Sequence, residues 1–261
     1  MRWASRDTSW SRGGAISGAG RETIGRRLPG GEERARLVRE MFDRIAGRYE
    51  LLNTLMTVGL HRVWNKKVIE ATGLRTGGRS LDLACGTGSL TRALAKRVGP
   101  QGYVLGVDFS KEMLRVAERR PSPNVEYWLG DATDLTGIED DSFDAATIAY
   151  GARNIPDLDA LFTEMARAIK PGGRVVCLEI ARPRGRFSAT FYRLWFDKIV
   201  PRLGAAVSGD AWAYSYLPES VKEFVAPGEL SDIMRHNGLQ DVAWQPVSGG
   251  IITLHVGTKP G

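Results

Sequence analysis

The sequence of 261 residues lacks several features that would assign a protein to a class at once. It has no continuous run of about 18 apolar residues, which argues against a transmembrane helix. Its two cysteines, Cys85 and Cys177, are too few for a disulfide framework and predict reduced thiols in a cytoplasmic protein. Three histidines and two cysteines form no cluster with metal-ligand spacing, so we predict no metal site.

A strong charge of one sign is also absent from most of the chain. The formal net charge is +6, and the first thirty residues contribute six arginines against Asp7 and Glu22. This Gly- and Ser-rich stretch lacks the apolar region of a signal peptide. We predict a disordered basic tail over residues 1–33, either inert or in contact with nucleic acid or a membrane. The remainder has no interleaved aromatic and basic patch, so we expect no nucleic-acid partner.

The order of expected elements indicates the fold class. Two helical stretches between about residues 32 and 73 precede short apolar runs that alternate with amphipathic ones. The expected strands are 79–84, 103–109, 125–131, 143–150 and 174–181, and the expected helices are 90–99, 110–120, 158–170 and 227–237. This alternation is typical of an α/β fold with a mostly parallel sheet and helices on both faces. Two final strand-like runs, separated by Gly249 and Gly250, predict an antiparallel hairpin.

The first expected strand leads into a glycine loop, DLACGTGSL, residues 82–90. In doubly wound folds such a loop lies at the carboxyl edge of the sheet, where ligands bind. The spacing Gly86-x-Gly88-x-x-Thr91 lacks the third glycine of the dinucleotide fingerprint, and no Gly-Lys-Ser/Thr follows as in a Walker loop. The loop therefore predicts a ligand that needs no pyrophosphate site, although the residues leave a nicotinamide-dependent oxidoreductase as an alternative.

Acidic residues end three successive expected strands. Asp108 lies twenty residues beyond Gly88 and suits the two hydroxyls of a ribose. Asp131 could accept a hydrogen bond from an adenine amino group, and the N–H of Ala132 could serve a ring nitrogen. Asp82 could meet a cationic amine, or it could only cap the following turn. Together these groups predict S-adenosylmethionine as the cofactor.

Longer segments resemble the UbiE/MenG family of class I methyltransferases, the C-methyltransferases of menaquinone and ubiquinone biosynthesis. The resemblance extends from about Met41 to Lys259. It is carried by FDRIAGRYELLNTLMTVGLHRVW (42–64), LDLACGTGSL (81–90), IAYGARNIPDLDALFTEMARAIKPGGRVVCLEIARP (148–183), GDAWAYSYLPESV (209–221) and GGIITLHVGTK (249–259). Ser89, Glu50 and Ala149 depart from the residues that are usual in the family at those positions.

The resemblance implies a Rossmann-like class I methyltransferase fold with a mostly parallel seven-stranded sheet and a C-terminal antiparallel hairpin. Within a methyltransferase domain over 34–261, it implies a helical substrate cap at 34–75 and an aromatic-rich insertion at 182–223. The cofactor contacts then fall on the glycine loop and on the strand-end residues. The predicted cofactor-binding residues are Asp82, Gly86, Thr87, Gly88, Asp108, Asp131 and Ala132.

The implied reaction is methylation of demethylmenaquinol to menaquinol, with a ubiquinone precursor or another small phenolic as alternative acceptors. Because an activated sulfonium donor needs no metal, the protein must align the two partners and favour the phenolate. Arg153 is the candidate for stabilising that phenolate, with Asn154 orienting it. The further candidates beside the acceptor are Tyr49, His61, Asp210 and Tyr214, although His61 could simply pack against Trp64.

The acceptor of this family carries a prenyl tail, so the resemblance implies a prenylated quinol as substrate. The helical face with Phe187, Phe191, Leu194, Trp195 and Ile199 could form a lid or rest on anionic headgroups, or it could pack on the core. We therefore also predict peripheral contact with the inner face of a membrane. A homodimer and a catalytically silent cofactor-binding protein remain open at this point.

Overall fold

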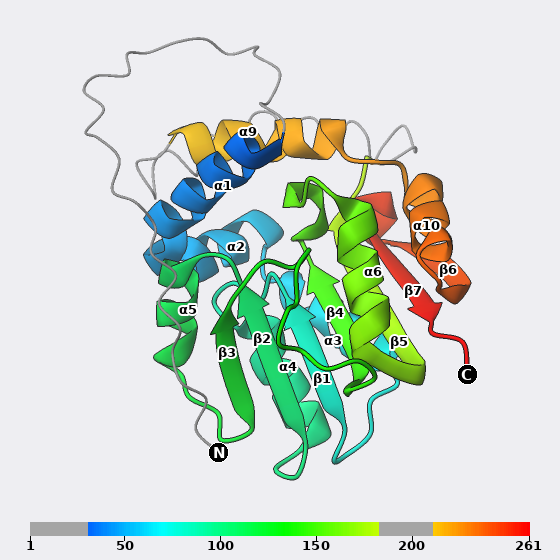
Figure 1. Ribbon diagram of the computed structural model, residues 1–261. Helices are drawn as coiled ribbons and strands as arrows, with labels where there is room; N and C mark the ends of the chain where they lie inside the picture. Colours follow the sequence, from blue (N-terminus) through cyan, green and yellow to red (C-terminus); the bar gives the residue numbers. More distant parts are fainter. Residues whose placement is uncertain (1–30, 183–210) are drawn as a thin grey trace.

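The computed structural model describes residues 31–182 and 211–261 (Figure 1). The predicted tail up to residue 30, most of the aromatic-rich insertion and the candidate Asp210 lie outside these ranges. Helix α1 begins at Gly31, slightly before the boundary predicted at residue 34. No helix within the described ranges is long and apolar enough to cross a bilayer.

A seven-stranded sheet has the order β3-β2-β1-β4-β5-β7-β6. Pairing is parallel from β3 to β5, and antiparallel between β5 and β7 and between β7 and β6. The strands are β1 (Arg79–Leu83), β2 (Tyr103–Asp108), β3 (Val125–Leu129), β4 (Phe143–Ala149), β5 (Ile169–Ile180), β6 (Gln240–Val247) and β7 (Ile252–Thr258). The predicted sheet and the hairpin near Gly249 are thereby confirmed.

Helices cover both faces of the sheet, as Figure 1 shows. The central helices are α3 (His61–Thr72), α4 (Ser89–Val98), α5 (Lys111–Glu118), α6 (Leu158–Ala168) and α10 (Pro227–His236). One core cluster joins the sheet to α3, α4 and α5, and the other joins it to α6 and α10. Burial of apolar side chains on both faces explains why the strands read as nearly continuous apolar runs.

The local signals for helix ends mostly agree with the structure. The Ser110 hydroxyl caps α5 by accepting a hydrogen bond from the N–H of Met113 at 3.1 Å, as the sequence predicts. The helix predicted over 158–170 ends earlier, because Ile169 already pairs with Phe143 as the first residue of β5. Tertiary pairing therefore overrides the helical pattern in its last turn.

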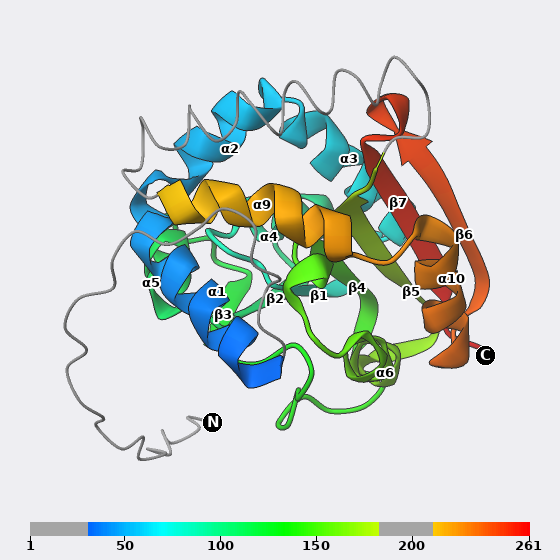
Figure 2. The same ribbon diagram turned by 90° about the horizontal axis from the view of Figure 1, so that it is seen from above.

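A roof of helices lies over the carboxyl ends of the central strands (Figures 1 and 2). It consists of α1 (Gly31–Ile45), α2 (Tyr49–Thr57) and α9 (Ala211–Glu223). Arg34 of α1 forms a salt bridge with Glu223 of α9 at 3.1 Å, which ties these two helices of the roof together. The space beneath this roof is where a doubly wound fold places its ligands.

Candidate active site

The glycine loop joins β1 to α4 at the switch point of the sheet. Gly86 and Gly88 adopt φ angles of 55° and 74°, in the left-handed region that favours glycine. A Cβ atom at Gly88 would lie 2.2 Å from the Tyr127 hydroxyl, so no larger residue fits there. The loop backbone is therefore free to approach a ligand, and Thr87 lies between the two glycines in its wall.

Asp108 holds the loop from the end of β2. Its carboxylate accepts hydrogen bonds from the N–H of Gly86 at 2.7 Å and from the N–H of Ser110 at 2.9 Å. Burial raises the pKa of Asp108 to about 6, against the effect of these hydrogen bonds. Each oxygen receives one backbone donor and keeps a further lone pair. The two ribose hydroxyls would find suitable acceptors here.

Asp82 is completely buried beneath the loop. Its carboxylate accepts hydrogen bonds from the hydroxyls of Thr91 at 2.6 Å and Thr147 at 2.7 Å. Burial raises the pKa of Asp82 to about 6, although both hydroxyls act in the opposite direction. In the described part of the chain, the partners of this carboxylate are side chains of α4 and β4. A residue that only capped the following turn would instead bind backbone N–H groups of that turn. Thr91, which replaces the third glycine, thus positions an acid at the mouth of the loop.

Asp131 and Ala132 follow β3 and line one cavity together with Asp108 and Gly86. The Asp131 carboxylate accepts from the N–H and the hydroxyl of Thr133, at 2.9 and 2.8 Å, and the side chain stays exposed. We call this the strand-end cavity. Its apolar walls include Phe109, Met113, Ile155 and Pro156. Acceptors for a ribose and an adenine amino group, beside flat apolar walls, fit the adenosyl part of S-adenosylmethionine.

A second cavity extends from the other side of the glycine loop. Its walls include Asp82, Thr87 and Ser89 from the loop region and Asn53 and His61 from α2 and α3. We call it the polar cavity. The buried acid at its base suits the cationic amine of a methionine moiety, so the two cavities together fit the cofactor that the sequence predicts.

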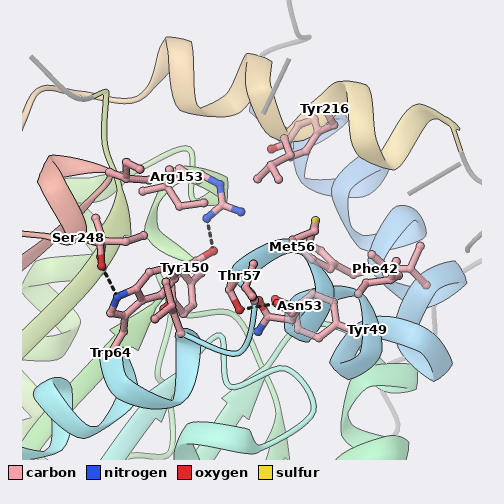
Figure 3. A pocket seen from close by; sticks show the side chains of 18 of the residues that line it. Phe42, Tyr49, Asn53, Met56, Thr57, Trp64, Tyr150, Arg153, Tyr216 and Ser248 are labelled. Carbon is pink, nitrogen blue, oxygen red and sulfur yellow. Dashed lines mark hydrogen bonds between the residues drawn. The ribbon is translucent and has the colours of Figure 1, made fainter. Parts of the chain in front are cut away.

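A third cavity lies beneath the roof and is lined mainly by apolar side chains (Figure 3). This apolar cavity has a volume of about 1120 Å³ when the space at its open mouth is counted. Its lining residues include Met41, Phe42, Ile45, Leu52, Met56, Trp64, Ile180, Leu217, Ile251 and Ile252. Tyr49 and Tyr150 line all three cavities, so a ligand on the cofactor side can meet a ligand in the apolar cavity at these two tyrosines.

Sequence reasoning missed Tyr150. It directly follows β4, has a φ angle of 60°, and is one of two strained positions at the switch point, with Ala84 after β1 at 48°. Its hydroxyl is buried and has no hydrogen-bond partner among the described residues. An unpaired hydroxyl at the junction of three cavities is available to a ligand. The signal in the sequence was an aromatic residue directly after a strand at the carboxyl edge.

Arg153, the predicted partner of the phenolate, lies in the wall of the apolar cavity. The Nη1 atom of its side chain donates to Glu179 Oε1 at 2.7 Å and to the carbonyl of Tyr150. The backbone N–H of Arg153 donates to Glu179 Oε2 at 3.1 Å. Burial disfavours the charged form, but Glu179 outweighs burial and raises the pKa of Arg153. The guanidinium therefore stays charged inside an apolar wall.

Glu179 is the second residue that sequence reasoning missed. It lies on β5 and is fully buried, with a further hydrogen bond from the N–H of Ile180 at 2.8 Å. Among the described residues, Glu179 and the Tyr150 carbonyl hold the guanidinium for which the sequence suggested Asn154. The Asn154 side chain instead accepts from the Tyr216 hydroxyl of α9 at 3.0 Å and faces the strand-end cavity. An acid within the apolar run RVVCLEIA was the available signal.

Tyr49 and His61 lie on different sides of the site. Tyr49 begins α2 and contributes to the strand-end, polar and apolar cavities. His61 lines the polar cavity, and its Nδ1 shares a 2.9 Å hydrogen bond with the Thr57 hydroxyl. Burial lowers the pKa of His61 and favours the neutral ring. Trp64, one turn later, lines the apolar cavity and donates to the Ser248 hydroxyl at 2.8 Å.

Solved structures agree with the fold. The chain is 19% identical to the [4+2]-cyclase SpnF, with a TM-score of 0.64 over 91% of this chain and 99% of that one. It is 20% identical to a *Haemonchus contortus* phosphoethanolamine N-methyltransferase 2 in complex with S-adenosylhomocysteine, with a TM-score of 0.62 over 85% and 60% of the two chains. At these identities the likeness carries the fold alone.

Sequence relatives define the family more closely. The chain is 39% identical over 235 residues to the demethylmenaquinone methyltransferase of *Desulfitobacterium hafniense*, covering 88% of this chain and 92% of the relative. It is 37% identical to the ubiquinone/menaquinone biosynthesis C-methyltransferase UbiE of *Pseudomonas paraeruginosa*, covering 87% and 91%. The model of the ubiE/COQ5 methyltransferase family matches residues 30–259. The predicted methyltransferase with S-adenosylmethionine as cofactor is confirmed, and the chain belongs to the ubiE/COQ5 methyltransferase family.

Proposed function

We propose that this enzyme methylates a ring carbon of demethylmenaquinol and thereby forms menaquinol. The observation that carries the proposal is the large apolar cavity that meets both cofactor-side cavities at Tyr49 and Tyr150. Relatives from *Desulfitobacterium hafniense* and *Staphylococcus aureus* are named demethylmenaquinone methyltransferases, at 39% and 38% identity. A ubiquinone precursor is the second candidate acceptor, because other relatives carry the name ubiquinone/menaquinone biosynthesis C-methyltransferase.

The cofactor side orients the donor. S-adenosylmethionine, when bound, supplies a methyl group on a sulfonium, which a nucleophilic carbon can attack without a metal. Asp108 would hold the ribose, Asp131 and the N–H of Ala132 the adenine, and Asp82 the amine, with Gly86 to Gly88 in close backbone approach. These contacts fix the direction from which the acceptor must come.

The acceptor side favours the nucleophilic form of the ring. The positive charge of Arg153, which Glu179 maintains, stabilises a phenolate beside it relative to the neutral phenol. An arginine side chain stays protonated and so acts as the electrostatic partner of the phenolate rather than as the base. Tyr49 and Tyr150 bound the junction where the ring carbon must approach the methyl group to about 3–3.5 Å.

The wider setting of the reaction is also part of the proposal. We assign α1 to α3 to the predicted substrate cap, because Phe42, Tyr49 and Trp64 of these helices line the apolar cavity. A prenylated acceptor implies that the enzyme works at the inner surface of a membrane. The lid role of residues 182–223, the roles of Asp210 and Tyr214, and the homodimer stay predictions.

Product analysis tests the acceptor directly. The full chain is incubated with S-adenosylmethionine and either reduced demethylmenaquinone or a reduced prenylated benzoquinone precursor, and the quinones are analysed by mass spectrometry. We expect the mass of one added methyl group on the naphthoquinone, and no product when the quinone stays oxidised. Methylation of the benzoquinone alone would replace the first candidate with the second. Isothermal titration should show binding of S-adenosylmethionine and none of NADH.

A further inference from the structure

The turn between α2 and α3 exposes apolar side chains to solvent. Leu51 and Leu55, four residues apart, share one face of α2, and Val58 directly follows the end of that helix. Leu60 and Val63 continue this surface after the turn. Their exposed fractions range from 40% for Leu55 to 74% for Val58. We call these five residues the turn patch.

Val58 makes the turn patch unusual. It ends α2 with φ 50° and ψ 37°, a left-handed conformation that strains a β-branched residue. Glycine or asparagine usually occupies such a position. Because Val58 is also the most exposed of the large apolar residues in the described chain, burial within this protein does not offset the strain. Strained positions of this kind concentrate where a protein binds something.

Cations predominate around the turn patch, because the two nearest acids in the chain, Glu50 and Glu70, face arginines and a lysine. Residues 51–69 include Arg62, Lys66 and Lys67 and no acidic residue. Lys67 follows Leu60 by seven positions and Val63 by four, so it extends the same helix face. Lys66 approaches Glu70 only to 3.9 Å, and both side chains are exposed, so its charge stays available. Apolar side chains bordered by cations complement an anionic lipid surface.

The turn patch is continuous with the apolar cavity. Val58 and Leu60 are exposed and at the same time line that cavity. Leu52 and Met56, which lie about 100° further around α2 than Leu51 and Leu55, line the same cavity. Helix α2 is therefore apolar toward solvent and toward the site, and Val58 and Leu60 of the turn belong to both surfaces.

We propose that the turn patch, with Lys66 and Lys67, docks on an anionic bilayer and lets a prenylated quinol enter the apolar cavity directly from the lipid. This surface lies outside the aromatic-rich insertion to which the sequence pattern assigns membrane contact. The inference rests on the proposed function for its substrate, whereas the docking itself does not depend on the reaction.

Vesicle co-sedimentation of the full chain without quinol tests the docking. Wild type should bind vesicles of phosphatidylglycerol and phosphatidylcholine more tightly than pure phosphatidylcholine, and added salt should weaken this preference. The variant Leu51→Ser/Leu55→Ser/Val63→Ser changes exposed residues that line none of the three cavities. It should lower the vesicle partition coefficient by about tenfold or more.

Two further variants make the test specific. Trp128→Ser/Leu129→Ser removes exposed apolar surface from β3, where the side chains are 38% and 61% exposed, and should change vesicle binding less than about twofold. Lys66→Gln/Lys67→Gln should remove the preference for anionic vesicles while binding to neutral ones persists. Equal binding by wild type and the triple turn-patch variant would refute the docking surface.

Turnover separates this inference from the proposed function. The triple variant should raise KM for a prenylated acceptor in vesicles and leave KM for a water-soluble, unprenylated acceptor unchanged. If wild type binds vesicles through the turn patch but methylates neither acceptor, the proposed function fails and the docking surface stands. If light scattering shows that the turn patch holds two copies together and wild type does not bind vesicles, the docking proposal is overturned.

Discussion

The cofactor side and the acceptor side of the site meet at Tyr49 and Tyr150 and are built in opposite ways. On the cofactor side, Asp82, Asp108 and Asp131 end successive parallel strands, and backbone N–H groups or nearby hydroxyls hold each carboxylate. The acceptor side draws on α2, the end of β4, β5, α9 and the hairpin, which are far apart in the chain. The donor site thus forms along one edge of the sheet from consecutive strand–loop–helix units, whereas the acceptor site needs helices and strands from distant parts of the chain.

The largest expected effect comes from the acceptor side. Arg153→Ala should lower kcat by about a thousandfold, because a positioned charge at the developing anion is lost, while affinity for S-adenosylmethionine changes little. Steady-state kinetics and isothermal titration measure the two quantities. Unchanged turnover would remove Arg153 from the mechanism.

Stability must be separated from catalysis in that experiment. Removing one partner of a buried pair costs about 3–5 kcal/mol, since it leaves Glu179 or Arg153 uncompensated. The double variant Arg153→Gln/Glu179→Gln should be more stable to unfolding than either single variant, because it leaves no charge buried alone. Its turnover should stay as low as that of the Arg153 variant. A double variant that restores kcat would mean that the pair only supports the fold.

The matching change on the cofactor side is Gly88→Ala. The added Cβ would meet the Tyr127 hydroxyl at 2.2 Å, and the left-handed backbone adds strain, so we expect the Kd for S-adenosylmethionine to rise about a hundredfold. Gly59→Ala is the control, because it has φ 76° but open space around the new Cβ. It should cost some stability and leave the Kd unchanged. If both changes affected the Kd equally, the tight packing of Gly88 against Tyr127 would have no role in cofactor binding.

The pH dependence should distinguish the two sides again. Burial raises the pKa values of Asp82 and Asp108 to about 6 in the folded protein, above the unfolded value near 3.8. Folding therefore takes up protons, and these groups make the free protein less stable as pH rises from about 4 to about 6. Cofactor affinity should follow the opposite trend and fall below about pH 6, where the carboxylates lose their charge.

Thermal unfolding across this pH range, with and without S-adenosylmethionine, measures both trends. Asp82→Asn should flatten the pH dependence of the free protein and raise its stability at neutral pH by an amount of the order of 2 kcal/mol. The same change should weaken cofactor binding. A variant with wild-type affinity would exclude Asp82 as the partner of the cofactor amine.

The smallest expected effect lies where the two sides are joined. Glu50 of α2 forms salt bridges with Arg92 at 3.2 Å and Arg120 at 2.6 Å, while Arg92 also donates to the carbonyl of Thr87. Since the Glu50 side chain is 33% exposed, Glu50→Gln should cost only about 0.5–1 kcal/mol. We expect KM for the acceptor to rise by about two- to threefold and kcat to stay constant. Glu50→Asp, with the charge kept, serves as the control in the same kinetic assay.

Particular residues show how far the sequence predicts the site. Gly86, Asp108 and Asp131 line the strand-end cavity, whereas Gly88, in the same tight turn as Gly86, lies against Tyr127. Asn154 and His61 line the strand-end cavity and the polar cavity, but their hydrogen-bond partners, Tyr216 and Thr57, differ from those expected. Local spacing indicates that a polar residue is in the site and does not specify which cavity it faces.

The sequence by itself determined the alternating α/β order, the donor loop without a pyrophosphate site, and the family to which the chain belongs. Only the tertiary structure decided that Glu179 pairs with Arg153, that Tyr150 stands at the junction of three cavities, and that the turn patch borders the apolar cavity. The physical reason is the range of the interactions. Turns, caps and strand-end contacts arise within a few residues, whereas a buried ion pair or a cavity wall exists only after distant segments have packed together.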